Sequence, residues 1–196
     1  MEIYDKLTKV YPSEYFSLNN TQTVIEEDEE GATTHEVIIE HNGVDILKVS
    51  KGLLTVERDS IVNNPYALVC DGVIAIDEKN KFIGYFELKS ACSTNNVLKA
   101  RKQIIDSQHH LWSIASKSAI EMTSFTEKGI VITQPISDED HRKARLRRQK
   151  NDESGNGFSP YHFLLNLLKN KAVANETGMP LLHFNAGEII PISKIL

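Results

Sequence analysis

The sequence lacks the features that mark several classes of protein. It has two cysteines, Cys70 and Cys92, and no CxxC pair, which argues against a disulfide framework or a cysteine-based metal site. Its first residues show neither the basic segment nor the apolar run of a signal peptide. No apolar stretch approaches the roughly 20 residues needed to span a bilayer. We therefore expect an intracellular, cytoplasmic protein without a membrane partner.

Positive charge is also in short supply. The 196 residues include 22 Lys and Arg against 27 Asp and Glu, for a net charge of −5. This balance argues against a protein that coats nucleic acid indiscriminately. The charges are clustered, however: residues 26–30 form an acidic run and residues 141–150 a basic one. Short acidic runs are usually solvated loops, and we interpret residues 26–30 in that way.

The order of the predicted elements indicates one α/β or α+β domain, with a mixed central sheet flanked by helices. We expect its core at about 35–135 and a C-terminal extension over 136–196 that carries the basic segment, a helix and the last strands. Hydrophobic periodicity predicts helices at 3–11, 96–118 and 160–169, and strands at 129–133, 181–184 and 189–190. Asn42-Gly43, between the β-prone runs 37–39 and 46–49, predicts a hairpin.

A second hairpin is predicted from residues 67–76 and 82–89, which are separated by a polar turn. Both arms are almost continuously apolar, as is typical of strands in the middle of a sheet. Alternation along the return arm places Glu87 and Lys89 on one face, and the turn can bring Asp71 beside Glu87. Charges buried in this way are costly unless they pair with each other or hold a metal. Two carboxylates suit Mg²⁺ or Mn²⁺, which prefer oxygen ligands.

These residues resemble the PD-(D/E)XK nuclease superfamily, which includes restriction enzymes, junction resolvases and RecB-like exonucleases. Asp71 matches its first acid, Glu87 its second and Lys89 its lysine, while Cys70 stands in place of the proline of the literal motif. The resemblance implies a restriction-endonuclease-like fold. It also implies a divalent metal held by Asp71 and Glu87, and an attacking water assisted by Lys89. The other interpretation is a structural Glu87–Lys89 pair on an edge strand, with a turn at Asp71.

Members of the superfamily often carry a further acid from the N-terminal part of the chain. We expect it at Glu40 or Glu57, with Glu14 a weaker candidate. The sequence alone does not choose among them.

The helix that follows the hairpin holds further candidates. Projection at 100° per residue places Arg101 and Gln108 near the centre of its apolar face, so both are expected to point toward the sheet. The resemblance implies a glutamine that shapes the active site; Gln108 fits by direction, whereas Gln103 fits by spacing but projects away from the face. An Arg and a Gln that reach outward to solvent are the alternative. His109 and His110 are expected on the surface.

The basic run is a candidate nucleic-acid contact. Its cations can each bind a phosphate, although a solvated helix face or a mobile loop would also account for them. They are Arg142, Lys143, Arg145, Arg147, Arg148 and Lys150.

Together these features predict a Mg²⁺- or Mn²⁺-dependent endo- or exonuclease, and the resemblance favours DNA over RNA. The alternative is a nucleic-acid-binding or regulatory protein that keeps the fold without catalysis. A homodimer is possible because small nucleases of this type often pair to cut two strands, but no residue predicts an interface.

Overall fold

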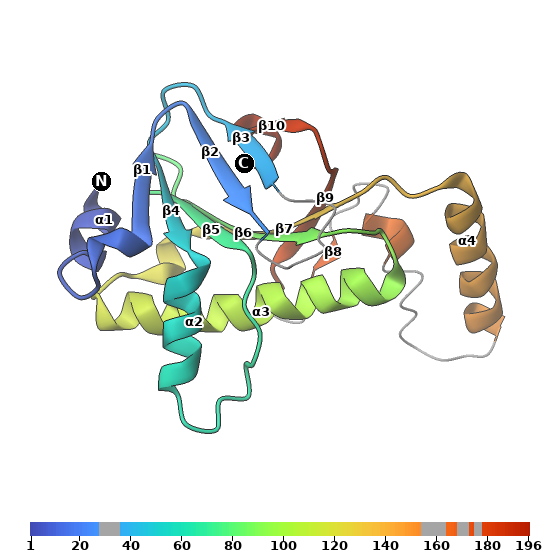
Figure 1. The fold of residues 1–196 in the computed structure, drawn as a ribbon, viewed down its shortest axis with the longest axis horizontal. Coiled ribbons are helices and arrows are strands. Elements are labelled where there is room, and N and C mark those ends of the chain that lie inside the picture. Colours follow the sequence, from blue (N-terminus) through green and yellow to red (C-terminus); the bar gives the residue numbers. More distant parts are fainter. Residues whose placement is uncertain (28–35, 154–163, 168–172, 175–177) are drawn as a thin grey trace.

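The computed structural model describes residues 1–27, 36–153, 164–167, 173–174 and 178–196 (Figure 1). A mixed seven-stranded sheet forms its centre, in the strand order β1-β4-β5-β6-β7-β9-β8. Neighbours from β1 to β6 are antiparallel, β6, β7 and β9 are parallel, and β8 is antiparallel to β9. The strands are β1 (Phe16–Asn19), β4 (Ile46–Ser50), β5 (Gly72–Ile76), β6 (Phe82–Lys89), β7 (Thr126–Thr133), β8 (Val173–Ala174) and β9 (Pro180–Asn185).

A small three-stranded sheet covers one face of the large sheet, and the helices that precede residue 120 cover the other (Figure 1). In the small sheet, β3 pairs antiparallel with β2 and parallel with β10. Its strands are β2 (Gln22–Glu26), β3 (Glu36–Glu40) and β10 (Ile189–Pro191); the helices are α1 (Glu2–Leu7), α2 (Lys51–Ser60), α3 (Thr94–Lys117) and α4 (Asp138–Glu153). The predicted mixed sheet flanked by helices is thus confirmed. Within the described ranges, no helix is long and apolar enough to cross a membrane.

Side chains that alternate along the central strands pack into two separate hydrophobic cores, one on each face of the sheet. Val73 and Tyr85 belong to the core beneath α3, whereas Ile74 and Phe86 belong to the core beneath the small sheet. Every residue of β5 and β6 is buried as a result. Their continuous apolar runs therefore predicted correctly a pair of central strands covered on both faces.

The first predicted hairpin was wrong. Asn42 and Gly43 do turn the chain, with φ angles of 32° and 89°. The flanking strands nevertheless join different sheets: β3 pairs with β2 and β10, while β4 pairs with β1 and β5. A turn signal reports only local backbone geometry and does not determine which strands pair.

Other elements agree with the sequence to within a few residues. The helix expected at 96–118 is α3, which is capped by Ser93: the Ser93 hydroxyl accepts from the Asn96 amide at 3.2 Å. The strands expected at 129–133, 181–184 and 189–190 are parts of β7, β9 and β10. Of the helix expected at 160–169, residues 164–167 are helical and the others lie outside the described residues.

Candidate metal centre

Asp71 and Glu87 lie side by side at one end of the β5–β6 pair. The strands pair with Gly72 opposite Phe86, and the Asp71 amide donates to the Phe86 carbonyl at 3.0 Å. Extending this antiparallel register by one residue sets Asp71 against Glu87, on the face toward α3. Asp71 is 4% exposed and Glu87 0%. Asp71 lies in a bend directly before β5, still hydrogen-bonded to β6 through the Phe86 carbonyl. β6 lies between β5 and β7, so the alternative of a Glu87–Lys89 pair on an edge strand is wrong.

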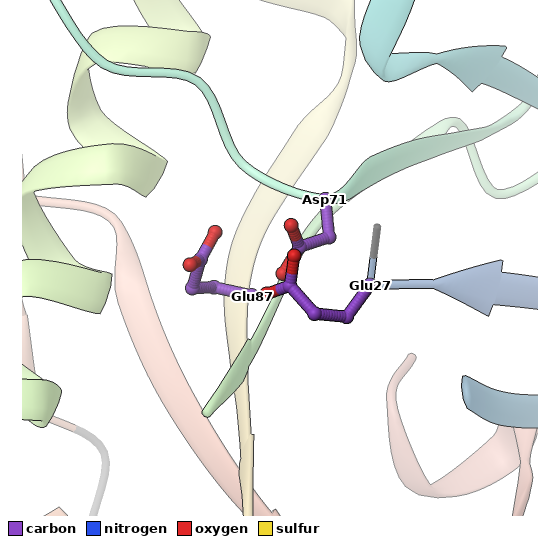
Figure 2. Close-up of side chains that lie close together, drawn as sticks. All are labelled: Glu27, Asp71 and Glu87. Carbon is purple, nitrogen blue, oxygen red and sulfur yellow. The ribbon is translucent and has the colours of Figure 1, made fainter. Parts of the chain in front are cut away.

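A third carboxylate reaches the pair from the small sheet. Glu27 follows the last residue of β2, and its side chain extends toward Asp71 and Glu87 (Figure 2). One ligand oxygen from each of the three acids lies within 4.8 Å of the other two. Gly72 permits this approach, because a Cβ there would lie 2.8 Å from the Cδ1 of Ile25. The missing side chain thus lets β2 pack closely where Glu27 must reach across.

Two lysines partly neutralise the three acids. Lys89 donates to Oε1 of Glu87, its neighbour on the same strand face. Lys51, the first residue of α2, lies 2.8 Å from Oδ1 of Asp71 and 3.5 Å from Oε1 of Glu27. With every group ionised, the site carries one negative charge in excess. Such an excess in a buried site favours a bound cation.

The hydrogen bonds of the two central acids are unequal. Oδ2 of Asp71 accepts from the Leu88 amide at 2.8 Å, and Oδ1 accepts from Lys51. Oε1 of Glu87 accepts from Lys89, but Oε2 is buried with no hydrogen-bond partner among the described residues. An unsatisfied buried oxygen costs about 1–3 kcal/mol, and more when the group is charged. This oxygen is therefore a candidate metal ligand.

Burial dominates the protonation of both acids. It raises the pKa of Asp71 from its ordinary 3.8 to about 6, against the opposing hydrogen bond from Lys51. Burial also raises the pKa of Glu87 well above its ordinary value, and the nearby charge of Asp71 raises it further. A divalent cation would reverse both shifts, because it favours the ionised carboxylates.

The donor set fits a hard divalent cation. All three candidate ligands, Glu27, Asp71 and Glu87, are carboxylates, and one oxygen of Glu87 has no hydrogen-bond partner in the described part of the chain. Mg²⁺ and Mn²⁺ prefer such oxygen ligands and keep several waters, so a small number of protein ligands suffices.

The expected third acids lie elsewhere. Glu40 is exposed on β3 and Glu14 is exposed in the short 3₁₀ helix Ser13–Tyr15. Glu57 is buried on α2, but it binds Ser113 and Lys117 of α3. These three expectations are corrected by the position of Glu27.

Glu27 was missed because it falls in the acidic run that we interpreted as solvated loop. A signal was nevertheless present: Thr23 and Ile25 alternate as inward-facing residues, and the same period of two reaches Glu27, whose side chain is 5% exposed. Residues 28–30 of the run lie outside the described residues.

Of the two glutamines of α3, Gln108 points toward the sheet as expected, whereas Gln103 is buried against expectation. Gln108 is buried, but its amide donates at 2.8 Å to Glu127, an acid outside the three-carboxylate group. Gln103 was predicted to project away from the sheet; it is 6% exposed, and it donates at 3.1 Å to the carbonyl of Val69, two residues before Asp71. The apolar face of α3 is thus wider than the projection assumed.

Three further predictions on α3 have different outcomes. Arg101 is half-buried. His109 is also half-buried and stacks on Tyr66, with ring centroids 3.8 Å apart. His110 was expected on the surface but is 1% exposed, and burial lowers its pKa. The segment that runs from α2 to β5 covers this side of the helix, which periodicity alone cannot reveal (Figure 1).

The basic run forms most of α4, which projects from the rest of the molecule (Figure 1). Arg142, Lys143, Arg145 and Arg147 are exposed, so a solvated helix face describes them better than a loop. The side chains of Arg148 and Lys150 are outside the described set.

No family model matches the chain, and neither the curated proteins nor the solved structures give a match. The resemblance to the PD-(D/E)XK superfamily therefore rests on Asp71, Glu87, Lys89 and their shared hairpin.

Proposed function

We propose that this protein is a Mg²⁺- or Mn²⁺-dependent nuclease that hydrolyses phosphodiester bonds in nucleic acid. One observation carries the proposal: three carboxylates converge at the end of a buried hairpin, while Oε2 of Glu87 has no hydrogen-bond partner within the described ranges. A purely structural arrangement would satisfy that oxygen, as most buried polar atoms are satisfied.

The residues divide the work by their chemistry. Asp71, Glu87 and Glu27 would hold the metal. When bound, a divalent metal lowers the pKa of a coordinated water and stabilises charge on a phosphate. Lys89 lies beside Glu87 and provides an ammonium that can orient the attacking water or neutralise the phosphate oxygens.

The substrate class is supported by charge. In a chain of net charge −5, the cations gathered on α4 create a local positive field that attracts a phosphate backbone. The family resemblance alone favours DNA over RNA.

The second candidate is a nucleic-acid-binding protein without catalysis. The observation in its favour is that Lys51 and Lys89 already neutralise two of the acids without a metal. In that protein the lysines would be permanent structural partners of Asp71 and Glu87.

Cleavage of a mixed panel of single- and double-stranded DNA and RNA tests the proposal, in EDTA, Mg²⁺ and Mn²⁺. Lys89→Ala and Glu87→Ala are expected to abolish metal-dependent cleavage. Lys117→Ala is the matched control, because it removes a lysine that also pairs with a buried glutamate. Unchanged cleavage in both site variants would overturn the site, and binding without cleavage in either metal would favour the second candidate.

A further inference from the structure

A surface pocket of about 460 Å³ opens where β6 and β7 end. One wall is the loop 90–94 between Lys89 and α3, and another is the loop 134–137 that leads into α4. Lys143 and Arg147 of α4 complete the lining together with Leu164. The pocket thus begins at Ser90, directly after the strand that carries Glu87 and Lys89.

The lining suits an anion. No aspartate or glutamate lines the pocket in the described part of this acidic chain. Ser90, Ser93 and Thr94 add hydroxyl groups, and the amino end of the 24-residue α3 lies in the same wall. Helix amino ends carry partial positive charge and favour bound phosphate. Lys143 and Arg147 of α4 line the same pocket as the amino end of α3, so the positive charge there does not come from the helix alone.

The two lining cations share one face of α4. Lys143 and Arg147 are four residues apart, and such residues lie one above the other on a helix. Lys143 also forms an exposed pair with Glu139 at 2.8 Å, an interaction worth little in water. Arg142 and Arg145 are equally solvent-facing but do not line the pocket. α4 therefore carries one pair of cations that lines the pocket, Lys143 and Arg147, and a second pair outside it, Arg142 and Arg145.

We infer that this pocket is a phosphate subsite, in which Lys143 and Arg147 hold a non-scissile phosphate of a nucleic-acid strand whose neighbouring bond lies at the carboxylate centre. The identity of the ligand as nucleic acid rests on the proposed function. The phosphate is either an internal phosphodiester or a 5′-terminal monoester, which share the oxygens that the pocket would bind.

Binding without cleavage tests the subsite. Fluorescence anisotropy in EDTA would measure the Kd of single-stranded DNA of about 12 nucleotides, labelled at its 3′ end, with and without a 5′-phosphate. The double variant Lys143→Ala/Arg147→Ala is compared with Arg142→Ala/Arg145→Ala, which removes the same charge from the same helix. Circular dichroism checks that both variants keep the helical content of the wild type.

The pocket variant is expected to raise Kd about tenfold and to lower the salt slope by about 0.7 for each lost contact. The other variant is expected to change Kd less than about threefold, because its cations act only through the general field. A loss confined to the 5′-phosphorylated strand identifies a terminal phosphate, and a loss with both strands an internal one. Equal losses in the two variants, no loss in the pocket variant, or no binding by the wild type would overturn the subsite.

The outcomes separate this inference from the proposed function. If the pocket variant loses binding and the wild type never cleaves in Mg²⁺ or Mn²⁺, the subsite stands and the nuclease proposal fails. If the wild type cleaves but both variants bind alike, the nuclease proposal stands and the subsite is wrong.

Discussion

Glu57 and Glu87 are both buried carboxylates paired with one lysine, yet their surroundings differ. Glu57 is 2% exposed and Glu87 0%. Both oxygens of Glu57 are satisfied: Lys117 lies 2.7 Å from each, and Ser113 also donates to Oε1. Among the described residues Oε2 of Glu87 has no hydrogen-bond partner, and the nearby charge of Asp71 raises the pKa of Glu87.

The difference shows that burial alone does not distinguish a structural carboxylate from a candidate metal ligand; the hydrogen-bond donors around it do. Removing a carboxylate from water is costly wherever it happens, and hydrogen-bond donors offset the cost. The fold provides a full set of donors to Glu57 and an incomplete set to Glu87. We therefore interpret Glu57 as a structural link between α2 and α3, and Glu87 as a group whose missing partner is a ligand.

The largest expected effect separates the two acids by activity. Glu87→Gln removes the charge of a candidate metal ligand, so metal-dependent cleavage should fall by at least about 10²–10³-fold. Glu57→Gln, measured at a temperature where circular dichroism shows it folded, should retain most of the wild-type rate. Cleavage rates in Mg²⁺ on the best substrate of the panel provide the comparison. Equal loss in both variants would remove the distinction.

The second effect reverses the ranking and concerns stability. In Glu57→Gln, one of the two oxygens becomes an amide donor that faces Lys117, so the free energy of unfolding should fall by about 2 kcal/mol. In Glu87→Gln, the amide nitrogen replaces an oxygen that had no partner, and a buried charge disappears. That variant should match or exceed the wild type in EDTA. Urea unfolding measures both, and a larger loss in Glu87→Gln would contradict the interpretation.

Local sequence pattern was sufficient for two of the three acids of the centre and for Lys89. Asp71, Glu87 and Lys89 belong to one hairpin, whose register follows from its turn and its apolar runs. Glu27 comes from a different sheet, and its approach depends on the close packing of β2 at Gly72, a contact that no short pattern encodes. The same limit explains the wrong pairing of β3 and β4.

The helix shows a related limit. The period of 3.6 predicted α3 and its inward stripe, but the projection placed Gln103 and His110 on the outer side. Both are buried, because the segment from α2 to β5 packs against that side of the helix. Helical periodicity indicates which face of α3 packs against the sheet, but it does not indicate that another segment covers the opposite face.

A third prediction uses pH. Between about pH 4 and 6 the folded protein holds the Asp71 proton more tightly than the unfolded chain, because burial raises this pKa from 3.8 to about 6. Unfolding in this window releases the proton, so this group makes stability fall as the pH rises. Relative to Asp71→Asn, the wild type in EDTA should lose on the order of 2 kcal/mol from pH 4 to 7.

Urea unfolding across this pH range measures the difference. Excess Mg²⁺ at pH 7 should restore stability to the wild type and not to Asp71→Asn, because the ion binds the deprotonated acid. Parallel pH profiles for the two proteins would contradict the raised pKa of Asp71.

The smallest expected effect concerns metal affinity. It tests whether the ammonium of Lys51 competes with a metal ion for the carboxylates of the centre. Its ammonium lies between Asp71 and Glu27, so its positive charge opposes a metal at the same oxygens. Lys51→Met should tighten Mn²⁺ binding about tenfold by calorimetry, and in EDTA it should lower stability, since two carboxylates lose their counter-charge.

Lys48→Met is the matched control: Lys48 is 23% exposed against 26% for Lys51, but it pairs at 3.8 Å with the exposed Glu26. That control should change Mn²⁺ affinity less than about twofold, because the pair is solvated and screened. If Lys51→Met instead weakens Mn²⁺ binding, the lysine supports the metal geometry, and the counter-charge at this site does not compete with the ion.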